Sequence, residues 1–217
     1  MISQINSIGS RLCSEEQRRR ILRIAEAQFA ATGLTSTVMA SIAKAARVPE
    51  ELMRLHCGTK RKLFEEVVTR NSRTRLASLQ KRLFSMADAP PLECIERMAE
   101  STVLSCVDPA GNASVMSWAL MEIPDFAADI YRAEIGSTEA LWDGEIRRRL
   151  GDSPVRGRLA VHLVPYAAHA CMAFGLWLVT LRHNPTTAKA PACQYAGGIR
   201  NAALAVLTAP SGTFEAA

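Results

Sequence analysis

Apolar residues recur at intervals of three and four along almost the whole chain of 217 residues. This spacing places them on one face of an α-helix. Paired β-strands would instead show alternating apolar and polar residues around Asn-Gly or Asp-Gly turns, and the sequence lacks that pattern. The hydrophobic pattern therefore predicts an all-α protein.

Local start and stop residues divide the pattern into nine helices. Ser14 and Gln17 have the spacing of a capping box, Gly33 is placed to end the first helix, and Thr37 and Thr59 are placed to cap the second and fourth. Breaks that contain proline separate the later helices. The expected helices are about 14–31, 38–45, 49–56, 60–86, 91–107, 111–121, 124–150, 156–183 and 192–208.

The composition is that of an ordinary folded protein, with 48% apolar and 22% charged residues. The six cysteines are far apart, and none has a partner at the spacing of a zinc site. We therefore expect free thiols in a reducing cytoplasm, with no metal and no other cofactor. The first residues lack the basic start and apolar run of a signal peptide, which also favours a cytoplasmic protein.

Charge is distributed unevenly along the chain. Residues 1–87 contain 16 Lys and Arg against 7 Asp and Glu, whereas residues 88–217 contain 10 against 14. A basic first part joined to a mildly acidic second part indicates that the first part meets a polyanion. A solvated basic face without a partner is the alternative.

Residues 159–181, LAVHLVPYAAHACMAFGLWLVTL, contain no Asp, Glu, Lys or Arg over a length that suffices to span a bilayer. His162, Pro165 and His169 within the segment argue against a membrane helix. A helix is also apolar all round when one side packs in its own domain and the other against a second subunit. We therefore predict a homodimer without membrane association.

Residues 42–64, IAKAARVPEELMRLHCGTKRKLF, place two short helices three or four residues apart, which is the spacing of a helix-turn-helix. Around them, residues 20–68, RILRIAEAQFAATGLTSTVMASIAKAARVPEELMRLHCGTKRKLFEEVV, resemble the N-terminal domain of TetR-family transcriptional regulators. The resemblance rests on the apolar stripe that ends at Phe29 and on Gly33, Thr37, Ile42, Ala43, Ala46, Val48, His56, Lys60, Leu63 and Phe64.

The resemblance implies two domains. Residues 11–62 would form a three-helix DNA-binding domain with the helix-turn-helix at about 37–56, and residues 63–210 a helical domain that dimerises and binds a small molecule. The implied function is that of a ligand-responsive repressor that binds double-stranded DNA at a palindromic operator as a homodimer.

The second helix of a helix-turn-helix lies in the major groove, where each base pair shows a distinct pattern of donors and acceptors. The resemblance implies phosphate contacts at Lys60 and at the helix start near Thr37. Arg11 and Arg18–Arg20 are placed to extend these contacts towards the flanking minor groove, and a solvated helix surface is the alternative for these arginines. The predicted DNA-binding residues are Thr37, Arg47, Glu50, Glu51, Arg54, His56 and Lys60.

Several of these residues depart from the family pattern. Arg47 stands where the family usually has glycine, and a positive φ there would cost about 1 kcal/mol. Arg54 replaces a phosphate-binding tyrosine with a charged fork that suits phosphate. Glu50 and Glu51 suit the positive end of the helix and can accept from a cytosine amino group, but phosphate would repel them.

The second domain is rich in aromatic and thioether side chains, which predicts a pocket for a small apolar or aromatic ligand. The same residues suit a well-packed core, and both interpretations stand. His162 and His169, seven residues apart, are either ligand contacts or ordinary packed histidines. The predicted pocket residues are Met98, Trp118, Met121, Phe126, Tyr131, Trp142, Tyr166, His169 and Phe174.

An enzyme is the competing class, but the sequence has no glycine-rich phosphate loop, Gly-x-Ser-x-Gly elbow, His-Glu-x-x-His motif or cysteine cluster. We therefore predict that the protein is not an enzyme. The second alternative keeps the fold and has a degenerate helix-turn-helix, so that the dimer binds a ligand or another protein and binds DNA weakly or without specificity.

Overall fold

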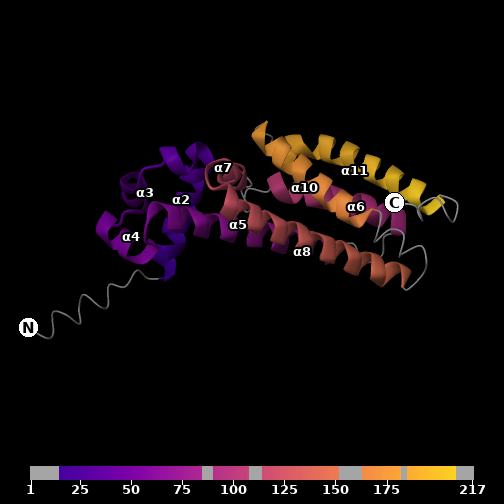
Figure 1. Cartoon of the computed structure of the whole chain (residues 1–217), viewed down its shortest axis with the longest axis horizontal. Coiled ribbons are helices and arrows are strands. Elements are labelled where there is room, and N and C mark those ends of the chain that lie inside the picture. Colours follow the sequence, from indigo (N-terminus) through magenta and orange to yellow (C-terminus); the bar gives the residue numbers. More distant parts are fainter. Residues whose placement is uncertain (1–14, 85–89, 108–113, 152–162, 182–184, 209–217) are drawn as a thin grey trace, which may run out of the picture. The chain divides into compact units, whose positions relative to one another are not determined.

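The computed structural model describes residues 15–84, 90–107, 114–151, 163–181 and 185–208. Every regular element within these ranges is an α-helix, which confirms the predicted fold class (Figure 1). The chain divides into two compact units. The first unit comprises residues 1–70 and 114–127, and the second comprises residues 71–113 and 128–217.

Two of the helices, α5 and α8, pass from one unit into the other, because the chain divides inside each of them. The first unit holds α2 (Glu15–Ser36), α3 (Met39–Ala46), α4 (Glu50–Cys57), the start of α5 (Lys60–Phe84) and α7 (Ser114–Glu122). The second unit holds the rest of α5, α6 (Pro91–Val107), most of α8 (Pro124–Leu150), α10 (Val164–Thr180) and α11 (Pro185–Thr208).

The core of the first unit lies where α2 meets α5. The rings of Phe29 and Phe64 are both fully buried and meet edge to face, with centroids 4.8 Å apart. Ile42 from α3 and Met53 from α4 are buried as well. Burying each such side chain stabilises the fold by about 1.5–3 kcal/mol. This small core fixes the short helices α3 and α4 on the longer ones.

The regular part of α2 ends at Gly33, which has φ 76°. A side chain at that φ would be strained, so glycine is required there. Thr37 is buried, and its hydroxyl donates to the carbonyl oxygen of Gly33 over 2.6 Å. The residue at the N-cap of α3 is Val38, which makes no side-chain cap. The prediction that Thr37 caps this helix is therefore wrong, because its hydroxyl closes the preceding turn instead.

The turn of the helix-turn-helix is centred on Arg47, which is left-handed at φ 54° and ψ 45°. Its amide donates to the carbonyl oxygen of Lys44 over 3.1 Å, and the amide of Val48 donates to that of Ala43 over 3.1 Å. These bonds satisfy the end of α3 in the usual manner of a left-handed helix terminus. Arg47 thus adopts the positive φ for which a steric cost was expected from the sequence, at the position where the family usually has glycine.

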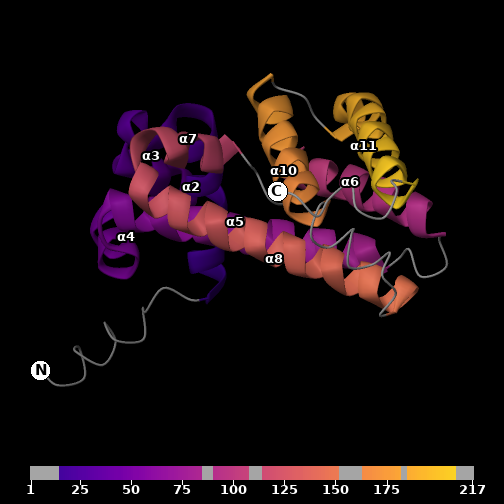
Figure 2. The ribbon, with the colours of Figure 1, turned by 45° about the vertical axis from the view of Figure 1, so that its right-hand side comes forward.

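In the second unit, α10 and α11 both pack against α6 (Figure 2). Met98 of α6 and Trp142 of α8 are fully buried in the core between the helices. The indole nitrogen of Trp142 donates to the hydroxyl of Thr102 over 3.1 Å, so its one polar group is satisfied inside the core.

A buried ion pair joins α5 to α8 within the second unit. The guanidinium of Arg75 donates to both carboxylate oxygens of Glu134 over 2.7 and 2.6 Å, and the hydroxyl of Ser72 donates to the same carboxylate over 2.8 Å. The side chains of Arg75 and Glu134 are 2% and 3% exposed. Since each would be costly to bury alone, the two charges depend on one another.

The helix bounds agree with the sequence patterns except near two prolines. The last helix begins at Pro185 and includes Pro191, although the pattern places its start at 192. Pro185 suits the first position of the helix, where an amide has no intrahelical partner, whereas Pro191 lies inside the helix and removes one backbone hydrogen bond there. The predicted helix 156–183 is described from Val164 to Thr180, and residues 152–162 lie outside the described part. None of the described helices is long and apolar enough to cross a bilayer.

Replacing Arg47 by glycine should stabilise the first unit, because glycine adopts a positive φ without the steric cost of a Cβ atom. We expect the free energy of unfolding to rise by about 0.5–1 kcal/mol in urea denaturation at pH 7. Lys44→Gly is the matched control, since it places glycine inside α3 and should lower stability by about 1 kcal/mol. An Arg47→Gly variant no more stable than the parent would contradict the prediction.

Candidate nucleic-acid interface

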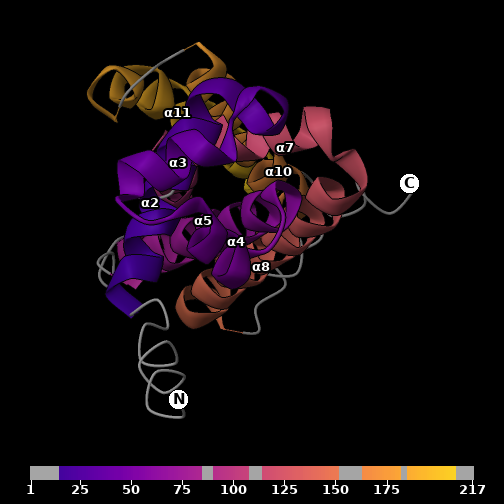
Figure 3. The same ribbon diagram turned by 90° about the vertical axis from the view of Figure 1, so that its left-hand side faces the viewer.

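The outward face of α4 is the candidate DNA-reading surface. Met53 and Cys57 of α4 are four residues apart and point into the core of the first unit. Residues on the opposite side of this helix therefore point outward. Glu51, Arg54 and Leu55 are exposed, and Figure 3 shows α4 on the side of the molecule that faces the viewer. A short helix anchored on one side and exposed on the other is the arrangement that a major groove accepts.

Glu50 and Arg54 pair along this helix. The Nε and Nη2 atoms of Arg54 donate to the same carboxylate oxygen of Glu50 over 2.9 and 2.6 Å. The arginine is exposed and the carboxylate is half-buried, so solvent screens the pair and it contributes little to stability. Its consequence is electrostatic, because the carboxylate offsets the one arginine on α4 that was predicted to bind phosphate.

Leu55 is a candidate contact that the sequence pattern did not single out. Its side chain is 77% exposed on α4, although large apolar residues are normally buried. In a DNA complex such a side chain can contact the methyl group of thymine. A helical projection of α4 with Met53 and Cys57 on the inner side places Leu55 on the outer side, so the signal lay in the sequence.

Lys60 and Thr37 lie together at the junction between α2 and α3. The Nζ atom of Lys60 donates to the carbonyl oxygens of Thr35 over 3.1 Å and Thr37 over 2.9 Å. The lysine therefore holds this junction within the first unit. Of the other predicted DNA-binding residues, His56 is half-buried near the end of α4 and Arg47 is exposed in the turn.

Helix α7 closes the same junction from its other side. The carboxylate of Glu122 accepts from the amide of Leu34 and, over 3.1 Å, from the amide of Thr35. The indole nitrogen of Trp118 donates to the carbonyl oxygen of Ala30 over 3.1 Å. A Cβ atom on Gly33 would lie 2.8 Å from the Trp118 ring, so glycine also makes room for this contact.

These contacts perturb the ionisation of Glu122. Burial by itself would raise the pKa of its carboxyl group, but the hydrogen bonds from Thr35 and Leu34 and the charge of Lys60 hold the pKa below the ordinary 4.5. The amides of Leu34 and Thr35 therefore bind Glu122 in its ionised form. Its contribution to stability is fully present above pH 4.5 and is lost as the pH falls through the lowered pKa.

The arginines at the start of α2 have different neighbours. Arg18 donates to Glu66 over 2.6 Å, Arg19 donates to Glu15 over 3.3 Å, and Arg20 donates to the carbonyl oxygen of Ala46 at the end of α3. Arg18 is thus neutralised inside the unit, while Arg19 stays exposed. Arg11, which was predicted to extend the phosphate contacts, lies outside the described residues.

Comparison with known proteins gives matches among solved structures alone. No family model and no curated protein matches the sequence. A TetR-family regulator of Thermus thermophilus, PfmR, superposes with a TM-score of 0.63 at 19% identity, over 89% of this chain and 97% of that one. A putative TetR-family regulator of Mesorhizobium loti gives 0.62 at 20% identity, over 88% and 96%.

Two further matches widen this set. A regulatory protein of the TetR family from Rhodococcus superposes with a TM-score of 0.61 at 19% identity, over 91% of this chain and all of that one. AibR, described in complex with isovaleryl coenzyme A and operator DNA, gives 0.54 at 17% identity, over 86% and 97%. The chain has the TetR-family fold. This confirms the resemblance that the residues around the helix-turn-helix indicated.

Within this TetR fold, the predicted pocket residues fall into both compact units. Trp118, Met121 and Phe126 belong to the first unit, where Trp118 contacts α2 and Met121 is exposed. The other six belong to the second unit; they are Met98, Tyr131, Trp142, Tyr166, His169 and Phe174.

Among the second-unit residues, Met98 and Trp142 are fully buried, whereas Tyr166 is exposed. Tyr131 meets His169 edge to face with ring centroids 6.0 Å apart. Burial, with contributions from Cys106 and Glu134, raises the pKa of Tyr131 to about 12, so its hydroxyl stays protonated at neutral pH. The structure thus brings Tyr131 of α8 and His169 of α10 together through an aromatic contact.

Phe174 lies elsewhere in the second unit, stacked on Tyr195 with ring centroids 4.2 Å apart. A cavity of about 150 Å³ opens near the end of α5, and its described lining includes none of the predicted pocket residues. Within the described ranges, no group of three or more His, Cys, Asp or Glu side chains is arranged to hold a metal ion. The composition of the ligand pocket remains a prediction.

Replacing Glu122 by glutamine should loosen the α2–α3 junction, because a neutral amide accepts from two backbone amides less well than a carboxylate. We expect a loss of about 1–2 kcal/mol in the free energy of unfolding at pH 7. The difference from the parent should shrink as the pH falls through the lowered pKa of Glu122, because the parent carboxylate then becomes protonated.

The control for this prediction is Glu15→Gln, which removes an exposed carboxylate of the same unit. It should cost less than about 0.5 kcal/mol at either pH. Equal effects of the two substitutions at pH 7 would show that Glu122 does not secure the junction.

Proposed function

We propose that this protein belongs to the TetR family and is a transcriptional regulator that binds a palindromic operator as a homodimer and releases it in response to a small apolar or aromatic molecule. The observation that carries the proposal is the exposed face of α4, held beside the left-handed turn at Arg47 in a fold shared with TetR-family regulators. Double-stranded DNA is accordingly its macromolecular partner.

The chemistry of α4 supports base contacts at two neighbouring positions. Glu51 and Leu55 are four residues apart and both exposed, so they share one strip of the helix surface. A carboxylate accepts from the amino group of cytosine, and an aliphatic side chain contacts the methyl group of thymine. Arg54 lies beside them and supplies phosphate contact when it exchanges its Glu50 partner for the duplex.

The homodimer is supported by one exposed apolar strip on α10. Tyr166, Ala173 and Trp177 recur on the same side of this helix and are all exposed, with Tyr166 at 75% and Trp177 at 52%. An apolar strip of this kind is stabilised when a second subunit covers it. Two copies would then present two α4 helices to half-sites about one turn of duplex apart, roughly 34–36 Å.

Ligand response is supported by the composition of the second unit and by AibR, which is described with both isovaleryl coenzyme A and operator DNA. A ligand releases DNA only if it binds better to the dimer whose α4 helices are misplaced for the two half-sites. A coupling free energy of about 1–3 kcal/mol would change operator affinity 5- to 150-fold. We assign transmission to α5, which continues from the first unit into the second.

A second candidate function has an observation in its favour. Glu50 offsets Arg54, and Glu51 adds a further negative charge on the exposed face of α4. A helix with this charge pattern suits a module that keeps the fold but has lost operator specificity. Such a protein would bind DNA weakly, in a manner sensitive to salt and indifferent to sequence.

The deciding experiment is selection of duplexes from a random pool by the full-length protein at physiological salt, followed by titration of the enriched duplexes. A recovered palindrome with half-sites one turn apart supports the operator-binding regulator. Enrichment of no sequence, with binding that collapses as salt rises, supports the degenerate module instead.

Two variants separate base contacts from phosphate contacts in that assay. Arg54→Ala should weaken binding to every duplex alike and flatten the dependence of log K on log salt by about 1. Leu55→Ala should leave that slope unchanged and relax the preference at one position of each half-site. An unchanged slope for Arg54→Ala would refute its assignment to phosphate.

Trp177→Glu should disrupt the dimer, because it places a charge on the strip that a second subunit covers. Size-exclusion chromatography with light scattering should show the parent as a dimer and the variant as a monomer, with operator affinity reduced at least tenfold. Ser137→Glu, which adds the same charge to an exposed position of α8, should remain dimeric. A Trp177→Glu variant that stays dimeric would contradict the assignment of the interface to α10.

A further inference from the structure

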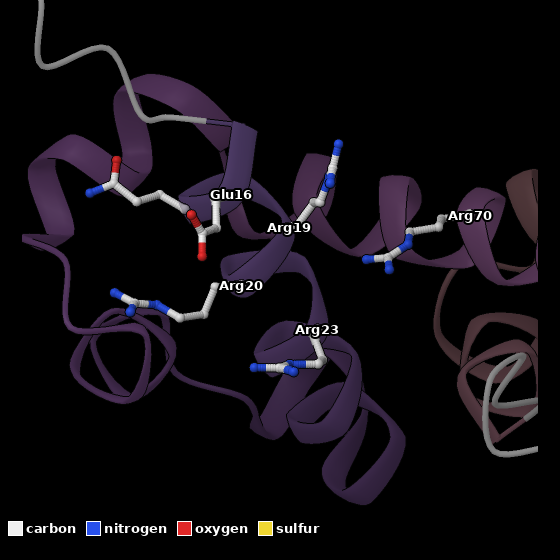
Figure 4. A pocket seen from close by; sticks show the side chains of 6 residues that line it. Glu16, Arg19, Arg20, Arg23 and Arg70 are labelled. Carbon is white, nitrogen blue, oxygen red and sulfur yellow. The ribbon is translucent and has the colours of Figure 1, made fainter.

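A groove of about 490 Å³ on the first unit is lined by four arginines. One face of α2 supplies Arg19, Arg20 and Arg23 together with Glu16, and α5 supplies Arg70 (Figure 4). The three arginines and Glu16 follow the spacing i, i+3, i+4 and i+7, which aligns their side chains along one side of the helix. We call this site the arginine groove; Gln17 completes its described lining.

The charge of the arginine groove is strongly unbalanced. Its described lining contains four arginines and one carboxylate residue, Glu16. The ion pair of Arg19 with Glu15 is long at 3.3 Å and highly exposed, so it offsets little of this charge. Like charges held close together repel one another, and a bound anion with several oxygens would relieve that repulsion.

Arg20, which lines the groove, also carries an unpaired donor. Its Nη2 atom donates to the carbonyl oxygen of Ala46, which fixes the guanidinium against the end of α3. Its Nε atom is buried and has no hydrogen-bond partner. A buried donor without an acceptor is unfavourable, so this guanidinium gains from any rearrangement that brings an anionic oxygen to it.

We propose that the arginine groove is a phosphate-binding site, separate from the exposed face of α4. Guanidinium groups hold phosphate oxygens in pairs, and several of them around one concave site match a ligand with more than one phosphate charge. Two sources supply this chemistry: the backbone of DNA beyond the half-site, and a soluble molecule that carries phosphate groups. Because Arg20 bridges the groove and α3, occupancy bears directly on the helix-turn-helix.

The test uses the full-length protein with Arg23→Ala/Arg70→Ala, which removes two groove arginines and leaves the Arg20 contact to Ala46 in place. The matched control is Arg132→Ala/Arg147→Ala, which removes the same charge from exposed positions of α8 in the second unit. Circular dichroism first establishes that both variants are folded.

The first arm measures thermal unfolding with millimolar pyrophosphate against sodium chloride of equal ionic strength. A ligand that binds only the folded state raises the melting temperature. If the groove binds soluble phosphates, pyrophosphate should raise the melting temperature of the parent and the control by about 2–5 °C and leave the Arg23/Arg70 variant unchanged.

The second arm measures binding to duplexes of random sequence as a function of salt, so it does not depend on operator reading. If the groove binds the DNA backbone, the slope of log K against log salt should be smaller by about 1–2 in the Arg23/Arg70 variant, in keeping with about 0.9 per lost phosphate contact. The control should keep the parental slope.

The expected result in either arm supports the site, and the arm that gives it identifies the ligand as a soluble phosphate or as the DNA backbone. If the Arg23/Arg70 variant matches the control in both arms, the proposal is wrong. This outcome is independent of the operator selection, because a specific operator can be recovered whether or not the groove binds phosphate.

Discussion

The junction between α2 and α3 is the constraint on which the presentation of α4 depends. Glu122 binds two amides on one side of it, and Lys60 binds two carbonyl oxygens on the other. Between them, Gly33 adopts the positive φ that lets the chain turn and Trp118 approach. Because α3 starts directly after this junction and α4 packs on α3, an error here would displace the whole helix-turn-helix.

Phosphate binding and base reading place opposite electrostatic demands on the first unit. Positive charge is concentrated on α2 and the neighbouring part of α5, in the arginine groove. The exposed face of α4 instead carries Glu50 and Glu51 beside a single arginine. If both proposals hold, non-specific attraction and sequence preference belong to different surfaces, in keeping with the rule that phosphate contacts position a protein while base contacts specify its site.

Local patterns were enough to predict most of the fold. The period of three and four predicted the all-α class, and Gly33 marked the end of α2 because few other residues accept its φ. The family's usual glycine at position 47 raised the possibility of a positive φ at Arg47, and the residue is left-handed. The start of α11 was displaced because Pro191 resembles a helix boundary, whereas in the fold it lies in an early part of the helix that began at Pro185.

The sequence by itself determined the helices, the spacing of the helix-turn-helix and the excess of positive charge in the first part of the chain, since each depends on residues close together in the chain. The tertiary structure alone decided that Glu122 and Trp118 close the α2–α3 junction from 88 positions away, and that Arg75 and Glu134 pair inside the second unit. It also decided that Arg70 of α5 joins three arginines of α2 around one groove. Such contacts join distant segments, and no local period or motif records which distant segments meet when a hydrophobic core closes.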